Sequence, residues 1–139
     1  MTYDPTNIFA KILRGEIPCQ KVYEDADAIV FMDVMPQSAG HALVVPKAAS
    51  RNVLDADPAV LAKILPLVQK IAVAAKAAFN ADGITMMQFN EPAGGQTVFH
   101  LHYHVIPRYD GVALKVHTGK MEDGAVLSAH AAKLRTALG

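Results

Sequence analysis

Three histidines, His100, His102 and His104, stand at alternate positions of the stretch HLHYHV. On a β-strand successive side chains point to opposite faces, so this spacing places the three imidazoles on one face and the apolar residues between them on the other. The apolar face can pack against a helix. Because the chain has only six histidines in 139 residues, three in strict alternation indicate chemistry rather than chance.

Three interpretations of this row remain open. A structural histidine ladder is disfavoured, because clustered imidazoles repel one another when protonated. A zinc site is possible because neutral imidazoles bind zinc, but strand residues two apart lie about 7 Å apart at their Cα atoms, and three in one line do not easily converge on an ion. The third interpretation is nucleophilic catalysis by His102. A glycine-containing turn over residues 91–95 favours it, since backbone N–H groups there can bind a phosphate.

The run over residues 100–106 matches the histidine triad motif, His-φ-His-φ-His-φ-φ, in which φ is hydrophobic. Around it the chain resembles the Hint-like, or protein kinase C-interacting-protein-like, bacterial members of the histidine triad (HIT) superfamily. The resemblance covers about residues 5–110 and fades beyond Arg108. The segments that support it are residues 7–12, 15–18, 31–37, 41–47, 90–91 and 94–97.

The resemblance implies a set of catalytic residues. His102 would attack the α-phosphorus of a nucleotide and form a nucleotidyl-histidine, which water then hydrolyses. His104 and His41 would flank the phosphate and stabilise its charge. His100 would orient the row through hydrogen bonds inside the protein. Thr97, where many relatives have Ser, would offer its hydroxyl to the bridging or leaving atom.

The resemblance also implies a nucleotide site, in which Asp33 accepts the ribose hydroxyls, Asn90 contacts sugar or phosphate, and Gln96 reaches the phosphate. The implied nucleotide-binding residues are Ile8, Phe9, Phe31, Asp33, Val34, Asn90, Gln96, Thr97, His102 and His104. Structural alternatives stand beside these roles. The apolar residues of the base slot could be core, Asp33 and Asn90 could belong to turns, and His41 could be a lone surface histidine.

The chain departs from many bacterial relatives at two places. Where they carry a Cys-x-x-Cys that holds a structural zinc, this chain has Asn7 and Ala10, so we expect no structural zinc. We also expect no other metal and no cofactor. Where several relatives read Pro-Lys-x-His, this chain has Ala49 in place of the histidine. Residues 96–98 and 107–108 also resemble the fragile-histidine-triad branch, which cleaves dinucleoside polyphosphates.

Composition excludes several classes of function. Thirteen Lys and Arg balance thirteen Asp and Glu, so no net field attracts nucleic acid or anionic lipid. The longest uncharged apolar stretches are shorter than the roughly 20 residues that span a bilayer, and the first residues do not resemble a secretory signal. Cys19 is the only cysteine, which excludes an internal disulfide and favours the cytoplasm. We expect Cys19 to be a small apolar filler.

The order of the predicted elements is that of a single α+β domain over residues 1–139, with a core at about 5–110 and a C-terminal extension at about 111–139. The resemblance implies an antiparallel sheet of about five strands, one long helix packed on it and short terminal helices. We expect His117 and His130 to be surface residues. The predicted elements are a helix from Asp4 to Gly15, a hairpin over 21–23 and 28–34, a strand over 41–45, a loop over 48–56, a helix over 57–79 bent at Pro66, strands over 84–90 and 96–107, and a helix over 127–138.

We therefore expect a hydrolase that cleaves a bond to the α-phosphate of a purine nucleotide of the AMP or GMP type, with nucleoside 5′-phosphoramidates as the first substrate class. The resemblance implies a homodimer, and we expect neither a nucleic acid nor a membrane as partner. Two alternatives remain: a dinucleoside polyphosphate hydrolase, and a regulatory or scaffold protein that binds a nucleotide.

Overall fold

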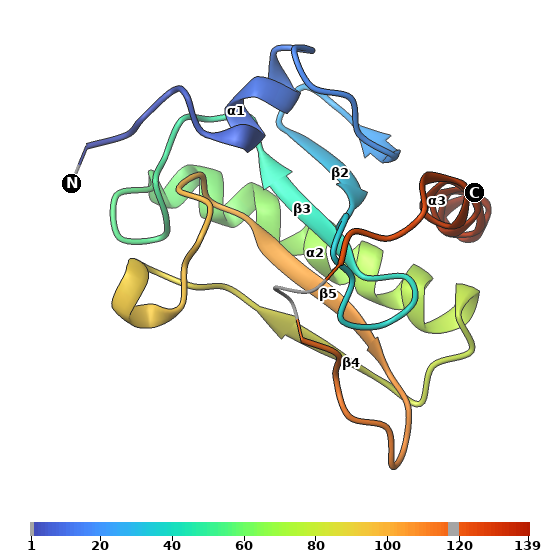
Figure 1. Cartoon of the computed structure of the whole chain (residues 1–139). Coiled ribbons are helices and arrows are strands. Elements are labelled where there is room, and N and C mark those ends of the chain that lie inside the picture. Colours follow the sequence, from blue (N-terminus) through green and yellow to red (C-terminus); the bar gives the residue numbers. More distant parts are fainter. Residues whose placement is uncertain (1, 117–119) are drawn as a thin grey trace.

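The computed structural model describes residues 2–116 and 120–139. Five strands form one antiparallel sheet in the order β1-β2-β3-β5-β4 (Figure 1). The α+β fold with a five-stranded antiparallel sheet and one long helix is therefore confirmed. The elements are α1 (Ile8–Leu13), β1 (Lys21–Glu24), β2 (Ala28–Met32), β3 (Ala42–Pro46), α2 (Pro58–Ala78), β4 (Gly83–Met87), the 3₁₀ turn η1 (Pro92–Gly94), β5 (Tyr103–Arg108) and α3 (Gly124–Leu138).

Both faces of the central strands are covered, and every residue of β2 and β3 is buried. One face packs on α2 and α3; in Figure 1, α2 passes behind the strands. The other face packs on Phe9 of α1, through Ile29, Phe31, Leu43 and Val45. Burial on two sides explains why these strands are continuous apolar runs with no polar alternation.

The long helix α2 begins as predicted. The Asp57 side chain accepts a hydrogen bond from the Ala59 N–H at 2.9 Å, and Pro58 occupies the first turn, where its missing N–H costs no helical bond. Ile64, Val68 and Ile71 recur every three or four residues and are buried against the sheet. This spacing gives α2 the apolar stripe of a core helix.

By length and composition α2 could also cross a bilayer, although Lys63, Lys70 and Lys76 divide it into short uncharged stretches. Its most apolar window has a mean hydropathy of 1.5, and 28% of that window is buried inside the protein. Packing of α2 on the sheet accounts for the buried stripe. The expected absence of a membrane partner stays a prediction.

The predicted start of the first helix is wrong. Asn7 caps α1, because its side-chain oxygen accepts the Ala10 N–H at 2.9 Å. Asp4 instead accepts the N–H and the hydroxyl of Thr6, at 2.8 and 2.6 Å, and so closes a turn before the helix. A short acceptor side chain serves equally well in a turn and at a helix start, and the residue types alone did not separate the two.

The predicted strand over residues 96–107 is wrong in its first half, because β5 begins only at Tyr103. Upstream of it, the Leu101 N–H donates to the Ser50 carbonyl at 2.9 Å, and the His100 carbonyl is 2.6 Å from His102 Nδ1. These partners replace the hydrogen bonds of a sheet ladder. Only His104 of the three histidines stands on a strand.

The predicted strand over residues 84–90 is also too long, since β4 ends at Met87. Beyond it, the side chains of Gln88 and Asn90 hydrogen-bond each other, and Asn90 Oδ1 accepts the Val53 N–H at 3.0 Å. The chain is thereby tied to the loop that precedes α2 instead of continuing the sheet.

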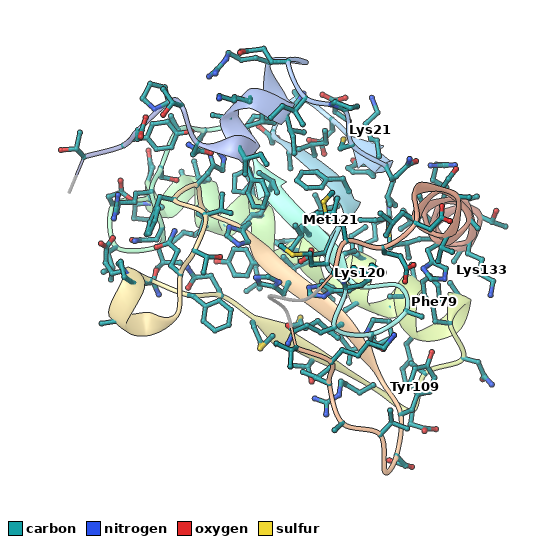
Figure 2. All side chains as sticks on the ribbon, viewed as in Figure 1. Lys21, Phe79, Tyr109, Lys120, Met121 and Lys133 are labelled. Atoms are coloured by element: carbon teal, nitrogen blue, oxygen red, sulfur yellow. The ribbon has the colours of Figure 1, made fainter. Side chains whose placement is uncertain are left out.

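Gly40 approaches Phe79 so closely that no larger residue fits. Its φ is +86°, and a Cβ at this position would lie 2.5 Å from the Phe79 ring. Figure 2 shows Phe79 beside Lys133 of α3, whose Nζ is 5.7 Å from the ring centroid. The Tyr109 hydroxyl donates to the Phe79 carbonyl at 2.6 Å.

His130, expected at the surface, is half-buried with its ring edge-on to Phe79, the two centroids 5.4 Å apart. Burial lowers the pKa of His130. The imidazole of His130 is half-buried because it packs against the apolar ring of Phe79, which follows α2. The surface histidine predicted at His117 lies outside the described residues.

Gly40→Ala should lower the free energy of unfolding by about 2–4 kcal/mol, because it adds a left-handed backbone penalty to an overpacked contact with Phe79. Gly111→Ala is the matched control. Gly111 also has a positive φ, +75°, but no described atom would lie within 4 Å of its Cβ, so it should lose only about 1–2 kcal/mol. Urea unfolding at one protein concentration measures both, and equal losses would contradict the close approach.

Candidate active site

The histidine cluster lies on the face of the sheet that α1 covers. His104 of β5 stands opposite Leu43 of β3, and directly paired residues share a face. Leu43 packs with Phe9 of α1, whose ring meets that of His102 edge-on with centroids 4.8 Å apart. The opposite face of β5 sends Val105 into the core with α2. The alternation of the motif therefore separates the site from the main core.

The four histidines that sequence analysis singled out for catalysis are brought together and buried. The exposed fraction is 0% for His41, 1% for His100, 8% for His102 and 4% for His104. The His104 ring centroid lies 5.0 Å from that of His102 and 5.1 Å from that of His41. In a region of low dielectric, the position of each proton depends on the partners of each ring nitrogen.

His100 is held at both ring nitrogens. Its Nε2 is 2.7 Å from the Pro46 carbonyl, which can only accept, so Nε2 carries a proton. Burial is the largest cause that lowers the pKa of His100, and it favours the neutral ring. Nδ1 of a neutral ring is then an acceptor, and the Tyr3 hydroxyl donates a hydrogen bond to it at 2.6 Å.

His102 is oriented by the backbone of His100. Its Nδ1 is 2.6 Å from the His100 carbonyl oxygen and therefore carries the donated proton. In a neutral imidazole this leaves Nε2 with a lone pair. That lone pair is the group a nucleophilic histidine requires.

His41 and His104 form a second ordered chain. The backbone N–H of Gln37 donates to His41 Nδ1 at 3.1 Å, so a neutral His41 carries its proton on Nε2. Nε2 is 2.9 Å from His104 Nδ1 and donates to it. The proton of a neutral His104 then lies on Nε2. A hydrogen-bond donor thus stands beside the lone pair of His102.

Asp33 joins this chain at the end of β2. Its Oδ1 accepts the Met35 N–H at 2.9 Å, and its Oδ2 lies 3.4 Å from His41 Nε2 and 4.0 Å from His104 Nδ1. One ligand atom from each of Asp33, His41 and His104 lies within 4.8 Å of the others, close enough to hold one divalent cation.

Gln96 lies beneath the loop rather than at its surface, with 4% of its surface exposed. Its Nε2 donates to the carbonyls of Arg51 and Val98, at 2.7 and 3.0 Å. Its Oε1 accepts the Glu91 N–H at 2.8 Å and Asn52 Nδ2 at 3.0 Å. These four bonds pin the turn that precedes the triad, and the contact with phosphate predicted for Gln96 stays a prediction.

Arg51 and Asn52 were missed by sequence reasoning, although they clamp the same turn. Arg51 forms a two-point ion pair with Glu91, with N to O distances of 2.7 and 3.0 Å, and its guanidinium lies 4.2 Å from the Phe99 ring centroid. The hydrogen bond from Arg51 lowers the pKa of Glu91. Glu91 has a φ of +67°, which this clamp helps to hold. No local spacing in the sequence signals a pair forty positions apart.

The other residues of the predicted nucleotide site differ in their exposure. Phe31 is buried and edge-on to Phe9, whereas Ile8 and Val34 are 47% and 42% exposed. Thr97 is exposed on the turn upstream of the triad. Exposed apolar side chains beside buried aromatic rings can receive a flat apolar ligand.

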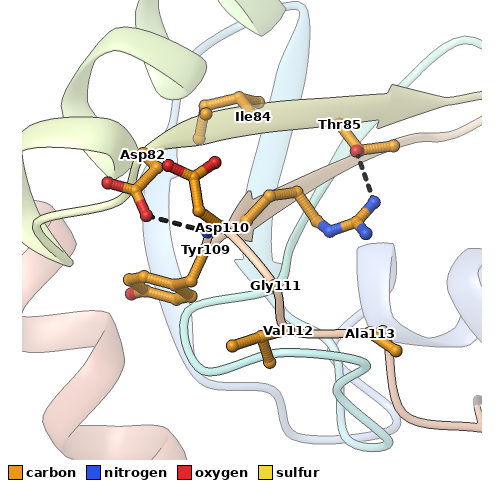
Figure 3. A pocket seen from close by; sticks show the side chains of 10 residues that line it. Asp82, Ile84, Thr85, Tyr109, Asp110, Gly111, Val112 and Ala113 are labelled. Carbon is orange, nitrogen blue, oxygen red and sulfur yellow. Dashed lines mark hydrogen bonds between the residues drawn. The ribbon is translucent and has the colours of Figure 1, made fainter.

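A separate hollow lies at the far end of the β4–β5 pair. It is lined by residues 82–85 and 108–113, where Arg108 donates to the Thr85 hydroxyl and the Asp110 N–H donates to Asp82 (Figure 3). Gly83 pairs with Arg108 at this end, while Met87 pairs with His104 at the other. The hollow therefore shares no lining residue with the histidine cluster.

Comparison with known proteins gives one consistent family. Residues 14–111 match the family model of the HIT domain. The chain is 38% identical over 133 residues to Protein hit of Bacillus subtilis, covering 91% of this chain and 92% of that protein. It is 39% identical over 101 residues to the adenosine 5′-monophosphoramidase hnt1 of Schizosaccharomyces pombe, covering 73% of each. The crystal structure of a Hit-like protein from Bartonella henselae has a TM-score of 0.92 and 54% identity, covering 98% of this chain and 99% of that one.

The buried His100 should make stability depend on pH. Burial lowers the pKa of His100, so below the unfolded value of about 6.5 the unfolded chain binds a proton that the native ring resists. Stability is therefore fully present above that value and falls as the pH falls toward the lower folded value. His100→Gln keeps a donor for the Pro46 carbonyl but cannot titrate.

Urea unfolding at about pH 7.5 and about pH 5.5 measures this effect. The wild type should lose more stability than His100→Gln between the two, by up to about 1.4 kcal/mol per pH unit. Equal losses in the two proteins would show that His100 takes up a proton as easily in the fold as in the unfolded chain.

Proposed function

Because the chain belongs to the HIT domain family, we propose that it is a nucleotide hydrolase that cleaves a bond to the α-phosphorus of a purine nucleotide. Its named relative in Schizosaccharomyces pombe is an adenosine 5′-monophosphoramidase. Nucleoside 5′-phosphoramidates are therefore the first substrate class. His102 is the nucleophile, and the intermediate is a nucleotidyl-histidine.

The observation that carries this proposal is a pair of hydrogen bonds from the main chain, one to His41 and one to His102, which fix the nitrogen that donates in each ring. The His102 Nδ1–H is committed to the His100 carbonyl, which leaves Nε2 as a lone pair. The chain from the Gln37 N–H through His41 leaves His104 with an Nε2–H donor. A nucleophile beside a donor matches a phosphate, which offers an electrophilic phosphorus and negatively charged oxygens.

The reaction has two balanced steps. In the first, a bond forms between His102 Nε2 and the α-phosphorus while the bond from phosphorus to the leaving nitrogen breaks, and that nitrogen takes a proton from solvent and departs as an amine. In the second, water attacks the same phosphorus and gives a proton to solvent, the bond from His102 Nε2 to phosphorus breaks, and the nucleoside monophosphate leaves while His102 regains its lone pair. His104 donates to a non-bridging oxygen in both transition states, and we assign the exposed Thr97 hydroxyl to the leaving atom.

The base and ribose contacts follow from the same placement. We assign the slot for the base to the exposed apolar side chains of Ile8 and Val34 and to the rings of Phe9 and Phe31, which contact each other edge-on. We assign the ribose hydroxyls to Asp33, because its carboxylate can accept them and its Oδ2 lies 3.4 Å from His41 Nε2 and 4.0 Å from His104 Nδ1. Asn90, which fastens the turn, completes the set that we assign to the nucleotide. Gln96 can join this set only by giving up one of the four hydrogen bonds that its side chain makes inside the turn.

His102→Gly should abolish turnover of an adenosine 5′-phosphoramidate, by at least roughly 10³-fold, because no neighbouring ring presents a lone pair in its place. Intact-protein mass after brief mixing should show one added nucleotidyl group on the wild type and none on the variant. His130→Gln is the matched control. It removes a histidine that packs on Phe79, away from the cluster, and should keep both the adduct and turnover.

The outcomes separate the alternatives. Turnover of diadenosine polyphosphates with little turnover of the phosphoramidate would favour the dinucleoside polyphosphate hydrolase. Nucleotide binding with neither adduct nor product would favour the regulatory or scaffold protein. Full activity of His102→Gly would overturn the assignment of the nucleophile.

We also propose that the protein works as a homodimer in the cytoplasm and that the partner copy adds to β4. Two strands are sheet edges, β1 and β4. The β1 edge carries the charged residues Lys21 and Glu24, and its Lys21 carbonyl accepts a hydrogen bond from Arg135. The β4 edge, GITMM, has no charged residue, and Met86 is 54% exposed. An uncharged edge is the one better suited to pairing.

Sedimentation of the wild type should give a mass about twice the 14.9 kDa of one chain. Met86→Arg should shift the protein toward the monomer, because it places a charge on the pairing edge. Val126→Arg, at an exposed apolar position of α3, is the control and should leave the mass unchanged. A monomeric wild type would rule out the dimer, and a dimeric Met86→Arg would rule out this edge.

A further inference from the structure

The segment before α1 reaches the histidine cluster through one side chain. The Tyr3 hydroxyl is 2.6 Å from His100 Nδ1, and the two rings meet edge-on with centroids 5.6 Å apart. Ninety-seven positions separate the two residues in the sequence. Tyr3 itself is half-buried, and it plays no part in the reaction described above.

The Tyr3 hydroxyl fills a need that burial creates. His100 is 1% exposed, and its Nε2–H already donates a hydrogen bond to the Pro46 carbonyl. Burial lowers the pKa of His100 and keeps the ring neutral, so Nδ1 is an acceptor away from water. A buried acceptor without a donor is costly, and a ring held at one nitrogen alone can pivot about that bond. Tyr3 supplies the donor that fixes the second nitrogen.

The fixed ring of His100 is connected to the nucleophile through the backbone carbonyl of His100. The ring of His100 is held between Tyr3 and Pro46, and the carbonyl of the same residue accepts the His102 Nδ1–H at 2.6 Å. That acceptor selects the tautomer of His102 and the direction of its Nε2 lone pair. A shift of the His100 backbone would therefore misdirect the lone pair without touching the substrate.

We propose that Tyr3 is a positioning residue of the active site: its hydroxyl locks the His100 ring, and the His100 carbonyl in turn aims His102 at the phosphorus. This inference rests on the proposed function of His102 as nucleophile. A positioning role changes the rate of the chemical step and leaves nucleotide binding intact, because Tyr3 touches no group assigned to the nucleotide.

Tyr3→Phe tests the proposal, since it removes one oxygen and keeps the ring. With an adenosine 5′-phosphoramidate, kcat should fall roughly tenfold while KM stays within about twofold. Tyr109→Phe is the matched control, because it removes a hydroxyl that donates at the same 2.6 Å to the Phe79 carbonyl. It should leave kcat unchanged.

A second measurement reads the hydrogen bonds directly. Nitrogen-15 spectra of the imidazoles, recorded without substrate, should show His100 Nδ1 of Tyr3→Phe moving toward the value of a nitrogen that accepts no hydrogen bond. His102 should also change its ratio of tautomers, because its acceptor is no longer fixed. Tyr109→Phe should give the wild-type spectrum.

The outcomes are distinct. Unchanged imidazole shifts in Tyr3→Phe, or a rise in KM with kcat unchanged, would overturn the positioning role. A wild-type protein that turned over no nucleotide would defeat the proposed function. The shifts would still decide whether Tyr3 controls the geometry of His100 and His102, because they need no turnover.

Discussion

One buried carbonyl, that of His100, governs the chemistry of the site. It accepts the Nδ1–H of His102 and so decides which nitrogen of that ring keeps a lone pair. The position of the carbonyl depends on a ring whose two nitrogens are held by Pro46 and Tyr3. Three segments far apart in the sequence therefore act on one lone pair. In a region that excludes water, such hydrogen bonds set direction as well as energy.

The two-sided sheet makes room for this arrangement. On the α2 side, β2, β3 and β5 contribute to a continuous apolar core. On the α1 side, a short helix covers only part of the sheet, and the space beside it holds the rings of His41, His102 and His104. A strand that alternates between the two sides serves both. β5 sends Val105 to the core and His104 to the site, so the same six residues carry stability and chemistry.

Much of this could be predicted from the sequence, because the signals are local. Asp57-Pro58 marks the start of α2, and apolar runs separated by a polar turn mark the β1–β2 hairpin. The resemblance to the histidine triad family pointed to the same four histidines. What could not be predicted depends on contacts distant in sequence. The Arg51–Glu91 pair, the bond between Tyr3 and His100, and the irregular path of residues 96–102 all rest on such contacts.

The groups that order the protons of the site include three from the main chain: the Gln37 N–H, the Pro46 carbonyl and the His100 carbonyl. A point mutation replaces a side chain but leaves these backbone groups in place. Side chains around the site can therefore differ between family members while the same main-chain groups continue to select the tautomers of the imidazoles. Insertions and deletions are the more dangerous events for this protein family, because they move the path of the chain that carries the donors and acceptors.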